Sequence, residues 1–289
     1  MYHSCRQLLE LAEAQKVPLH EIVIENEMKH NDISRGKVME KMKERYGIMF
    51  ASAEKALNQP LHTEGSLITG IASTQYRYSQ SGDTLCGRFI NTVMAMALSC
   101  SEVNASMGKI CAMPTAGSCG IVPAVLISIG EEYGKTEEDV INALITASGI
   151  GTVVVENATV AGSEGGCQAE CGVAAAMAAA GAVELMGGTP TMSVEAFTLS
   201  LINIMGLVCD PVAGLVQIPC AQRNASQAVN ALLSADLALG GMRFPIPADE
   251  VIDAMYKVGK LLPVQLKETA MGGIAATETG QVIAEKIYS

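Results

Sequence analysis

Two cysteines in the stretch GLVCDPVAGLVQIPCAQRN, residues 206–224, stand beside prolines. Cys209 leads into an Asp-Pro pair, and Cys220 directly follows Pro219. Because proline fixes its φ angle and does not continue a helix, we expect both thiols to lie in irregular, rigid backbone. Thiols at such positions are suited to holding a metal centre.

Two further cysteines, Cys167 and Cys171, stand four residues apart in GGCQAEC. The chain has no C-x₃-C-x₂-C run and no C-x₂-C pair, which excludes local ferredoxin-type and zinc-ribbon motifs. All four histidines lie in the first 62 residues, which disfavours a mixed Cys/His zinc site. What remains is a site built from distant cysteines: Cys209 and Cys220 with one or both of the GGCQAEC thiols. Three thiolates without a fourth suit a 4Fe-4S cluster with one open iron, which can act as a Lewis acid.

The chain has nine cysteines, an odd number, and its first 16 residues, MYHSCRQLLELAEAQK, are too charged for a signal peptide. We therefore expect a cytoplasmic protein whose thiols are free or bind metal rather than form disulfides. Cysteine is also a common core residue. We assign that role to Cys5, Cys86, Cys100 and Cys111.

Four stretches of the sequence, from about residue 60 onward, resemble the α chain of the iron-sulfur-dependent bacterial L-serine dehydratases. They are MPTAGSCGIVPAVL, GCQAECGVAAAMAAAGAVELMGGTP, CDPVAGLVQIPCAQRN and KETAMGGIAATETG. The resemblance implies that Cys167, Cys209 and Cys220 hold a 4Fe-4S cluster. It implies no ligand role for Cys171, which we assign to packing, or for Cys119, which we expect to be a neighbour of the site.

The same resemblance implies conversion of L-serine to pyruvate and ammonia by loss of water. The open iron would bind the serine hydroxyl and stabilise the charge that develops as the C–O bond breaks. With few cations available for the substrate carboxylate, we expect the turn PTAGSCG to bind it through backbone N–H groups and hydroxyls. The residues expected to contact the substrate are Thr115, Gly117 and Ser118.

A base must remove the α-proton of the substrate, and this chain offers two weak candidates, His62 and Lys109. In the family a β domain or a separate β subunit completes the enzyme, and the base can belong to it. Some single-chain members end in a cysteine that reaches the fourth iron position, whereas this sequence ends in AEKIYS. A separate β subunit, and hence a hetero-oligomer, is therefore expected.

Three other functions compete with this interpretation. The same cluster could eliminate sulfide from L-cysteine or water from another small hydroxy amino acid. The chain could also be a non-catalytic helical partner whose cysteines only fill its core. A pyridoxal-phosphate mechanism is disfavoured, because it needs a Schiff-base lysine and a phosphate cradle, and no Lys or Arg occurs between Lys135 and Arg223.

The charge distribution restricts the partners further. The formal net charge is −11, which argues against nucleic acid and anionic membranes as partners. The most apolar run, Val140 to Val155, is 16 residues long and contains Asn142 and Ser148, so it is short of the ~20 residues of a membrane span. We interpret this run as a buried helix.

The elements that position these residues are expected to be almost all helical. Residues 1–64 carry 19 of the 49 charged side chains and predict a helical surface segment, with a helix that begins after Ser34 and ends at Gly47. Further helices are expected from Asp83 to Gly108, after Thr136, and through the small-residue-rich stretches near 169–188, 191–206, 224–239, 247–260 and 275–287. Strand patterns are scarce. The sequence predicts an all-α fold, a single catalytic domain over residues 1–289 with cluster-binding turns between buried helices.

Overall fold

The structure is a computed structural model that describes residues 1–289, and it contains helices and turns but no β-strand. The α-helices are α1 (Cys5–Gln15), α2 (Leu19–Asn31), α3 (Arg35–Lys55), α4 (Ile71–Ser79), α5 (Gly87–Ala105), α6 (Ile121–Glu132), α7 (Glu137–Asn157), α8 (Gly162–Gly165), α9 (Val173–Leu185), α10 (Pro190–Ile202), α11 (Cys220–Leu239), α12 (Ala248–Leu261) and α13 (Glu278–Tyr288). A π-helical turn, η1 (Gln168–Gly172), and three 3₁₀ segments, η2 (Val212–Gly214), η3 (Val264–Leu266) and η4 (Gly273–Ala276), complete the fold. The prediction of an all-α fold is confirmed.

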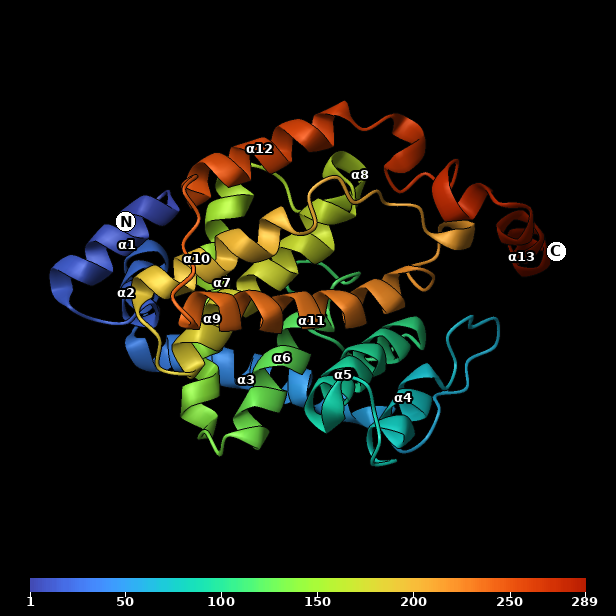
Figure 1. The fold of residues 1–289 in the computed structure, drawn as a ribbon, viewed down its shortest axis with the longest axis horizontal. Coiled ribbons are helices and arrows are strands. Elements are labelled where there is room, and N and C mark those ends of the chain that lie inside the picture. Colours follow the sequence, from blue (N-terminus) through green and yellow to red (C-terminus); the bar gives the residue numbers. More distant parts are fainter.

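Helix α9 lies at the centre of the hydrophobic core (Figure 1). All of its residues except Glu184 are buried, and it packs against α6, α7, α10 and α11. Its alanines and glycine let these neighbours approach closely: a methyl group at Gly181 would lie 2.8 Å from the carbonyl oxygen of Ala143 in α7. The small-residue composition of this stretch therefore sets how tightly the central helices pack.

Helix α7 is the one helix that is long and apolar enough to cross a membrane, judged by length and composition. Of its most apolar window, 67% is buried inside the protein, between α2, α6 and α9. Thr136 caps this helix, as the sequence predicted, and the structure shows a reciprocal capping box with Asp139. In this fold α7 is a core helix.

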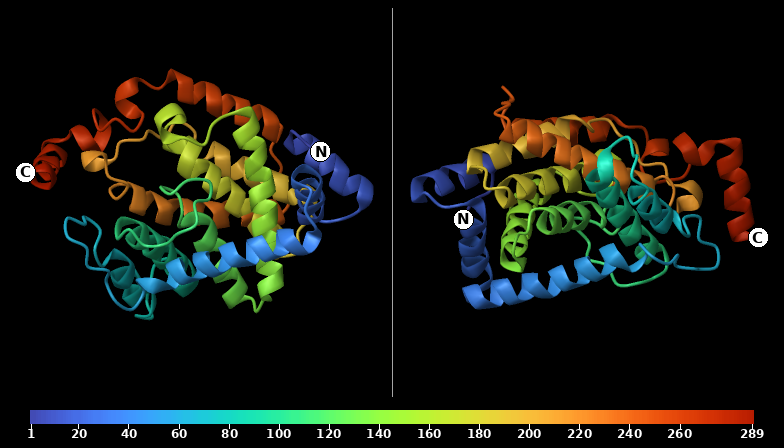
Figure 2. Two further views of the ribbon diagram at one scale, coloured as in Figure 1. Left: turned by 180° about the vertical axis from the view of Figure 1, so that it is seen from behind. Right: turned by 60° about the horizontal axis from the view of Figure 1, so that its bottom comes forward.

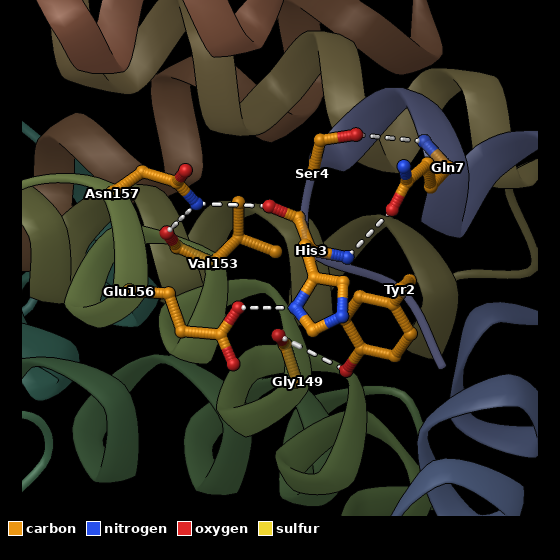
Figure 3. A network of polar contacts seen from close by, with 8 residues as sticks. All are labelled: Tyr2, His3, Ser4, Gln7, Gly149, Val153, Glu156 and Asn157. Atoms are coloured by element: carbon orange, nitrogen blue, oxygen red, sulfur yellow. Dashed lines mark hydrogen bonds and ion pairs between the residues drawn. The ribbon is translucent and has the colours of Figure 1, made fainter.

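The N-terminal residues are held against the end of α7 (Figure 3). The Tyr2 hydroxyl donates to the carbonyl oxygen of Gly149 at 3.2 Å, and His3 Nδ1 lies 3.0 Å from Glu156 Oε2. Asn157 Nδ2 donates to the carbonyl oxygen of His3 at 2.9 Å. Side chains of α1, α2 and α3 join the same core cluster of 62 buried residues as the central helices.

Several helix boundaries differ from the prediction; α10, for example, ends at Ile202 rather than at Gly206. Ser34 caps α3 as expected, but the helix continues through Gly47 to Lys55. Its buried side chains Met49 and Ala53 lie beyond the glycine, and their packing outweighs the cost of about 1 kcal/mol for a glycine inside a helix. Helix α5 begins at Gly87 rather than near Asp83, without a side-chain cap.

Figure 2 shows α3 along one edge of the bundle and the two termini at opposite ends of the molecule.

Candidate active site

Three separate segments bring Cys167, Cys209 and Cys220 together beside the start of α9. All three are buried, with 1%, 2% and 7% of their surface exposed. Burial is the main reason that the pKa of Cys220 is raised to about 12, and the charge of Cys167 adds to it. Burial and the charge of Cys167 likewise raise the pKa of Cys209. The charge of Cys220 also acts on Cys209, so the three thiols lie near one another and form one group, called here the cysteine trio.

Cys171 lies next to Cys167 and is completely enclosed. Contact with the Cys171 thiol lowers the pKa of Cys167 against the effect of burial, and the nearby Arg223 acts in the same direction. The pKa of Cys171 is raised by the same contact and by burial. Of the two, Cys167 is the one suited to be a thiolate ligand.

The two proline-flanked cysteines lie in different kinds of backbone, one irregular and one helical. Cys209 lies in irregular backbone, as predicted: its N–H donates to the carbonyl oxygen of Leu266, and its own carbonyl accepts from the N–H of Glu268. Cys220, in contrast, is the first residue of α11, which corrects the expectation that it lies outside a helix. The reason is positional, since Pro219 immediately before a helix blocks none of its internal hydrogen bonds.

The turn PTAGSCG leads into α6 and faces the residues that follow Cys167. The Thr115 hydroxyl lies 2.5 Å from Glu170 Oε1, to which it donates, and 3.1 Å from the Ser118 hydroxyl. Ser118 is completely buried. A methyl group at Gly117 would lie 2.6 Å from Glu170 Oε1, so this glycine lets the carboxylate approach the turn. The three residues expected to contact the substrate are thus joined to the GGCQAEC segment.

Glu170 is a functional candidate that the sequence analysis missed. Gly162 lies between these groups: a methyl group on it would be 3.1 Å from both Glu170 Oε2 and the Cys209 sulfur, and 3.5 Å from Glu268 Oε2. Burial raises the pKa of Glu170. The hydrogen bond from Thr115 lowers this pKa in part, and the charge of Glu268 raises it. A signal existed in the sequence, because Glu170 is the sole charged residue between Glu164 and Glu184.

Arg223 is the cation beside the cysteine trio. Its Nη1 donates to the carbonyl oxygen of Val208 at 2.9 Å and lies 2.8 Å from Asp210 Oδ1. The second contact is a close ion pair rather than an aligned hydrogen bond, since Oδ1 has no partner in hydrogen-bond geometry. Burial lowers the pKa of Arg223, but Cys167 and Asp210 together outweigh it and raise the pKa. Arg223 is the first basic residue after the long cation-free stretch.

The two candidate bases, His62 and Lys109, are exposed, and no hydrogen bond or ion pair joins either side chain to the cysteine trio. The loop that carries His62 is tied to the segment before Cys220, because the N–H of Leu67 donates to Gln217 Oε1 at 2.7 Å. This chain thus brings Glu170, rather than His62 or Lys109, to the trio.

The donor set can be compared with the metal centres considered above. No three Cys, His, Asp or Glu side chains converge closely enough to share a single metal ion. A mononuclear zinc site needs such convergence, whereas an iron-sulfur cluster takes each thiolate on a different iron. Three buried cysteine thiols are the donor type that iron-sulfur clusters take, so the residues present fit such a group.

A cavity of about 350 Å³ lies elsewhere in the molecule, and it is lined by side chains from α3 to α6 that include Glu54, Arg88 and Glu131. None of the residues discussed for the active site lines it. The chemistry inferred from the cysteines therefore does not belong to this cavity.

Comparison with known proteins links most of the chain to one family. The model of the family described as serine dehydratase alpha chain matches residues 14–275. The L-serine dehydratase alpha chain of Peptoniphilus asaccharolyticus is 46% identical over 283 residues, 98% of this chain and 97% of that one. A probable L-serine dehydratase alpha chain of Bacillus subtilis is 43% identical over 288 residues, covering 100% of this chain and 96% of the relative. The L-serine dehydratase of Haemophilus influenzae is 34% identical over 284 residues, which are 95% of this chain but 61% of that protein.

Proposed function

The chain belongs to the serine dehydratase alpha-chain family, and from this premise we propose that it is the α chain of an enzyme that converts L-serine to pyruvate and ammonia by loss of water. The observation that carries the proposal is the cysteine trio beside the Thr115–Glu170 contact. This region combines thiols that would bind a metal centre, hydroxyls that would bind the substrate and a buried carboxylate that would accept a proton. The resemblance inferred from four sequence motifs agrees with this family.

The cofactor that we propose is a 4Fe-4S cluster held by Cys167, Cys209 and Cys220. Three buried thiols from separate segments, with pKa values that influence one another, support it. When bound, such a cluster supplies a Lewis acid that stabilises negative charge on the departing hydroxyl oxygen.

The chain's own residues would bind the substrate and move its proton. The turn of Thr115, Gly117 and Ser118 would orient the substrate, with Thr115 at its accessible edge and Ser118 shaping the turn from inside. Glu170 is our candidate for the base, because burial raises its pKa and makes its carboxylate a better proton acceptor. Thr115 holds Oε1, so Oε2, on the side of Cys209, would take the α-proton.

We further propose that a separate β chain completes the enzyme in the cytoplasm. This chain spans 96–97% of two relatives that are named alpha chains. It spans 61% of the Haemophilus influenzae relative, which is named L-serine dehydratase without a chain designation. The additional length of that relative supports the proposal that further polypeptide takes part in the reaction.

Single cysteine variants test the ligand assignment. Cys167→Ala, Cys209→Ala and Cys220→Ala are each expected to lose iron and L-serine turnover after anaerobic reconstitution with the β chain present. Cys5→Ala is the matched control, because Cys5 is equally buried but lies in α1. Cys86→Ala is the second control; Cys86 is exposed, which corrects its assignment to the core. Both controls should keep their iron.

The same preparations separate the competing functions. Turnover of L-serine well above that of L-cysteine supports the dehydratase, and the reverse supports a lyase that eliminates sulfide. Equal iron content in all five variants would overturn the ligand assignment. A wild-type protein that is colourless and iron-free after reconstitution would reject the cluster itself.

A further inference from the structure

The first turn of α11 carries more than a cysteine. Cys220 begins this helix, and Arg223 and Asn224 follow in the same turn. These two side chains reach different segments of the chain, and each of those segments carries a different part of the proposed site.

Arg223 fixes the segment that carries Cys209. It donates to the carbonyl oxygen of Val208 and pairs with Asp210, so it holds the residues on both sides of this cysteine. Asp210 is buried, and its Oδ2 accepts from the N–H of Ile274 at 2.8 Å, which adds a second attachment from the C-terminal segment. A guanidinium that contacts two neighbouring groups holds a loop more firmly than a single point charge would.

Asn224 fixes the turn that carries Thr115 and Ser118. The side chain is completely buried, and it makes three hydrogen bonds through its two polar atoms. Oδ1 accepts from the N–H of Gly120 at 2.9 Å, while Nδ2 donates to the carbonyl oxygens of Gly117 at 2.7 Å and Cys220 at 2.9 Å. A buried amide that is hydrogen-bonded at both polar atoms favours one arrangement of the backbone around it.

On the basis of the function proposed above, we propose that the first turn of α11 assembles the site: Cys220 is a ligand, Arg223 is a positioning residue for the Cys209 ligand, and Asn224 is a positioning residue for the substrate turn. One rigid helical turn then sets the distance between the cluster and the substrate. Arg223 acts on the cluster, Asn224 acts on substrate binding, and neither needs to touch a reacting atom.

Variants of the two residues should separate iron binding from substrate binding. Arg223→Met keeps the length of the side chain and removes its donors, so iron per chain after anaerobic reconstitution should fall and the visible and paramagnetic signals of the cluster should change. Arg223→Lys, which keeps the charge, should retain more iron. Asn224→Ser should keep its iron, while KM for L-serine rises about tenfold or more and kcat changes less.

The matched control is Gln222→Ala, an exposed residue of the same turn without a side-chain hydrogen bond. Circular dichroism and thermal melting are recorded for every variant. The proposal is overturned if Arg223→Met keeps its iron and its spectra, or if Asn224→Ser loses iron and substrate affinity in the same proportion. An iron-free wild-type protein would instead reject the cluster.

Hydrogen exchange of the wild-type protein with its β chain keeps the proposal testable if a variant does not fold. Because Asn224 holds the turn in advance, the amide of Gly120 should exchange slowly before L-serine is added. Fast exchange that becomes slow only with L-serine would contradict a preassembled turn.

Discussion

At the scale of the residue, the site is defined by a few polar groups in apolar surroundings. Glu170 and the cysteine trio lie among alanines and glycines, so each charge is felt strongly by the others. Arg223 is the cation that offsets them. Titratable groups whose pKa values are shifted by burial and by one another are common at catalytic sites.

Glu170→Gln is expected to slow L-serine turnover and to stabilise the fold. Loss of the proton acceptor should lower kcat by about 10²-fold or more. The folded-state pKa of Glu170 is raised above its ordinary value of 4.5, so the stability that this group contributes at low pH is lost as the pH rises through the raised pKa. Glutamine does not ionise, and the melting temperature of the variant should therefore exceed that of the wild type at pH 7 but not below pH 4.5.

Turnover and melting curves between pH 4 and 8 check this prediction. Glu164→Gln is the control, an exposed acid in the neighbouring helix α8. Unchanged turnover in Glu170→Gln would remove Glu170 as the base.

At the scale of the element, side chains far apart in sequence tie helices and loops together. Glu102 in α5 is an example: its carboxylate is buried and accepts from the N–H groups of Leu61, Gly70 and Ala72. These bonds hold the start of α4 and the loop before it, which carries His62. The sequence could not reveal this role, because the partners are backbone groups 30 to 41 residues away.

Glu102→Gln should loosen that loop. The amide nitrogen that replaces one oxygen cannot accept a hydrogen bond, so at least one buried N–H loses its partner, at a cost of about 1–3 kcal/mol in the free energy of unfolding. Denaturant unfolding measures the loss, and hydrogen exchange of residues 61–72 should become faster. Glu10→Gln, an exposed acid in α1, should change neither quantity. Equal stability of both variants would show that the bonds contribute little.

At the scale of the whole molecule, the C-terminal segment runs beside the irregular segment that carries Cys209. Cys209 pairs with Leu266 and Glu268, Asp210 accepts from Ile274, and the Tyr288 hydroxyl donates to the carbonyl oxygen of Ala213 at 2.6 Å. Helix α13 therefore packs against η2 at the end of the molecule far from the N-terminus (Figure 1). Order in the Cys209 segment depends on chain that follows it by more than fifty residues.

Tyr288→Phe tests this dependence with the loss of one hydrogen bond. Unfolding free energy should fall by about 1 kcal/mol, and hydrogen exchange of residues 212–218 should become faster. Tyr78→Phe is the matched control, because Tyr78 is exposed like Tyr288 but its hydroxyl makes no hydrogen bond. Unchanged exchange in Tyr288→Phe would mean that α13 does not order this segment.

Helices and caps were predictable from sequence because they depend on neighbouring residues. The caps at Ser34 and Thr136 and the buried alanine-rich helix near residue 175 were found in this way. The end of α3 was predicted wrongly, since the packing of Met49 and Ala53 outweighs the local effect of Gly47.

The sequence by itself determined the all-α class, the family resemblance and the residue types available for chemistry, because composition, motifs and periodicity are properties of the linear chain. Only the tertiary structure decided which of those residues meet. The Thr115–Glu170 contact spans 55 residues and the Asn224–Gly117 contact 107, and such contacts depend on how closely the small-residue helices pack. Local patterns do not specify which segments pack against one another, so Glu170, Arg223 and Asn224 became recognisable as parts of the site once the helices were in place.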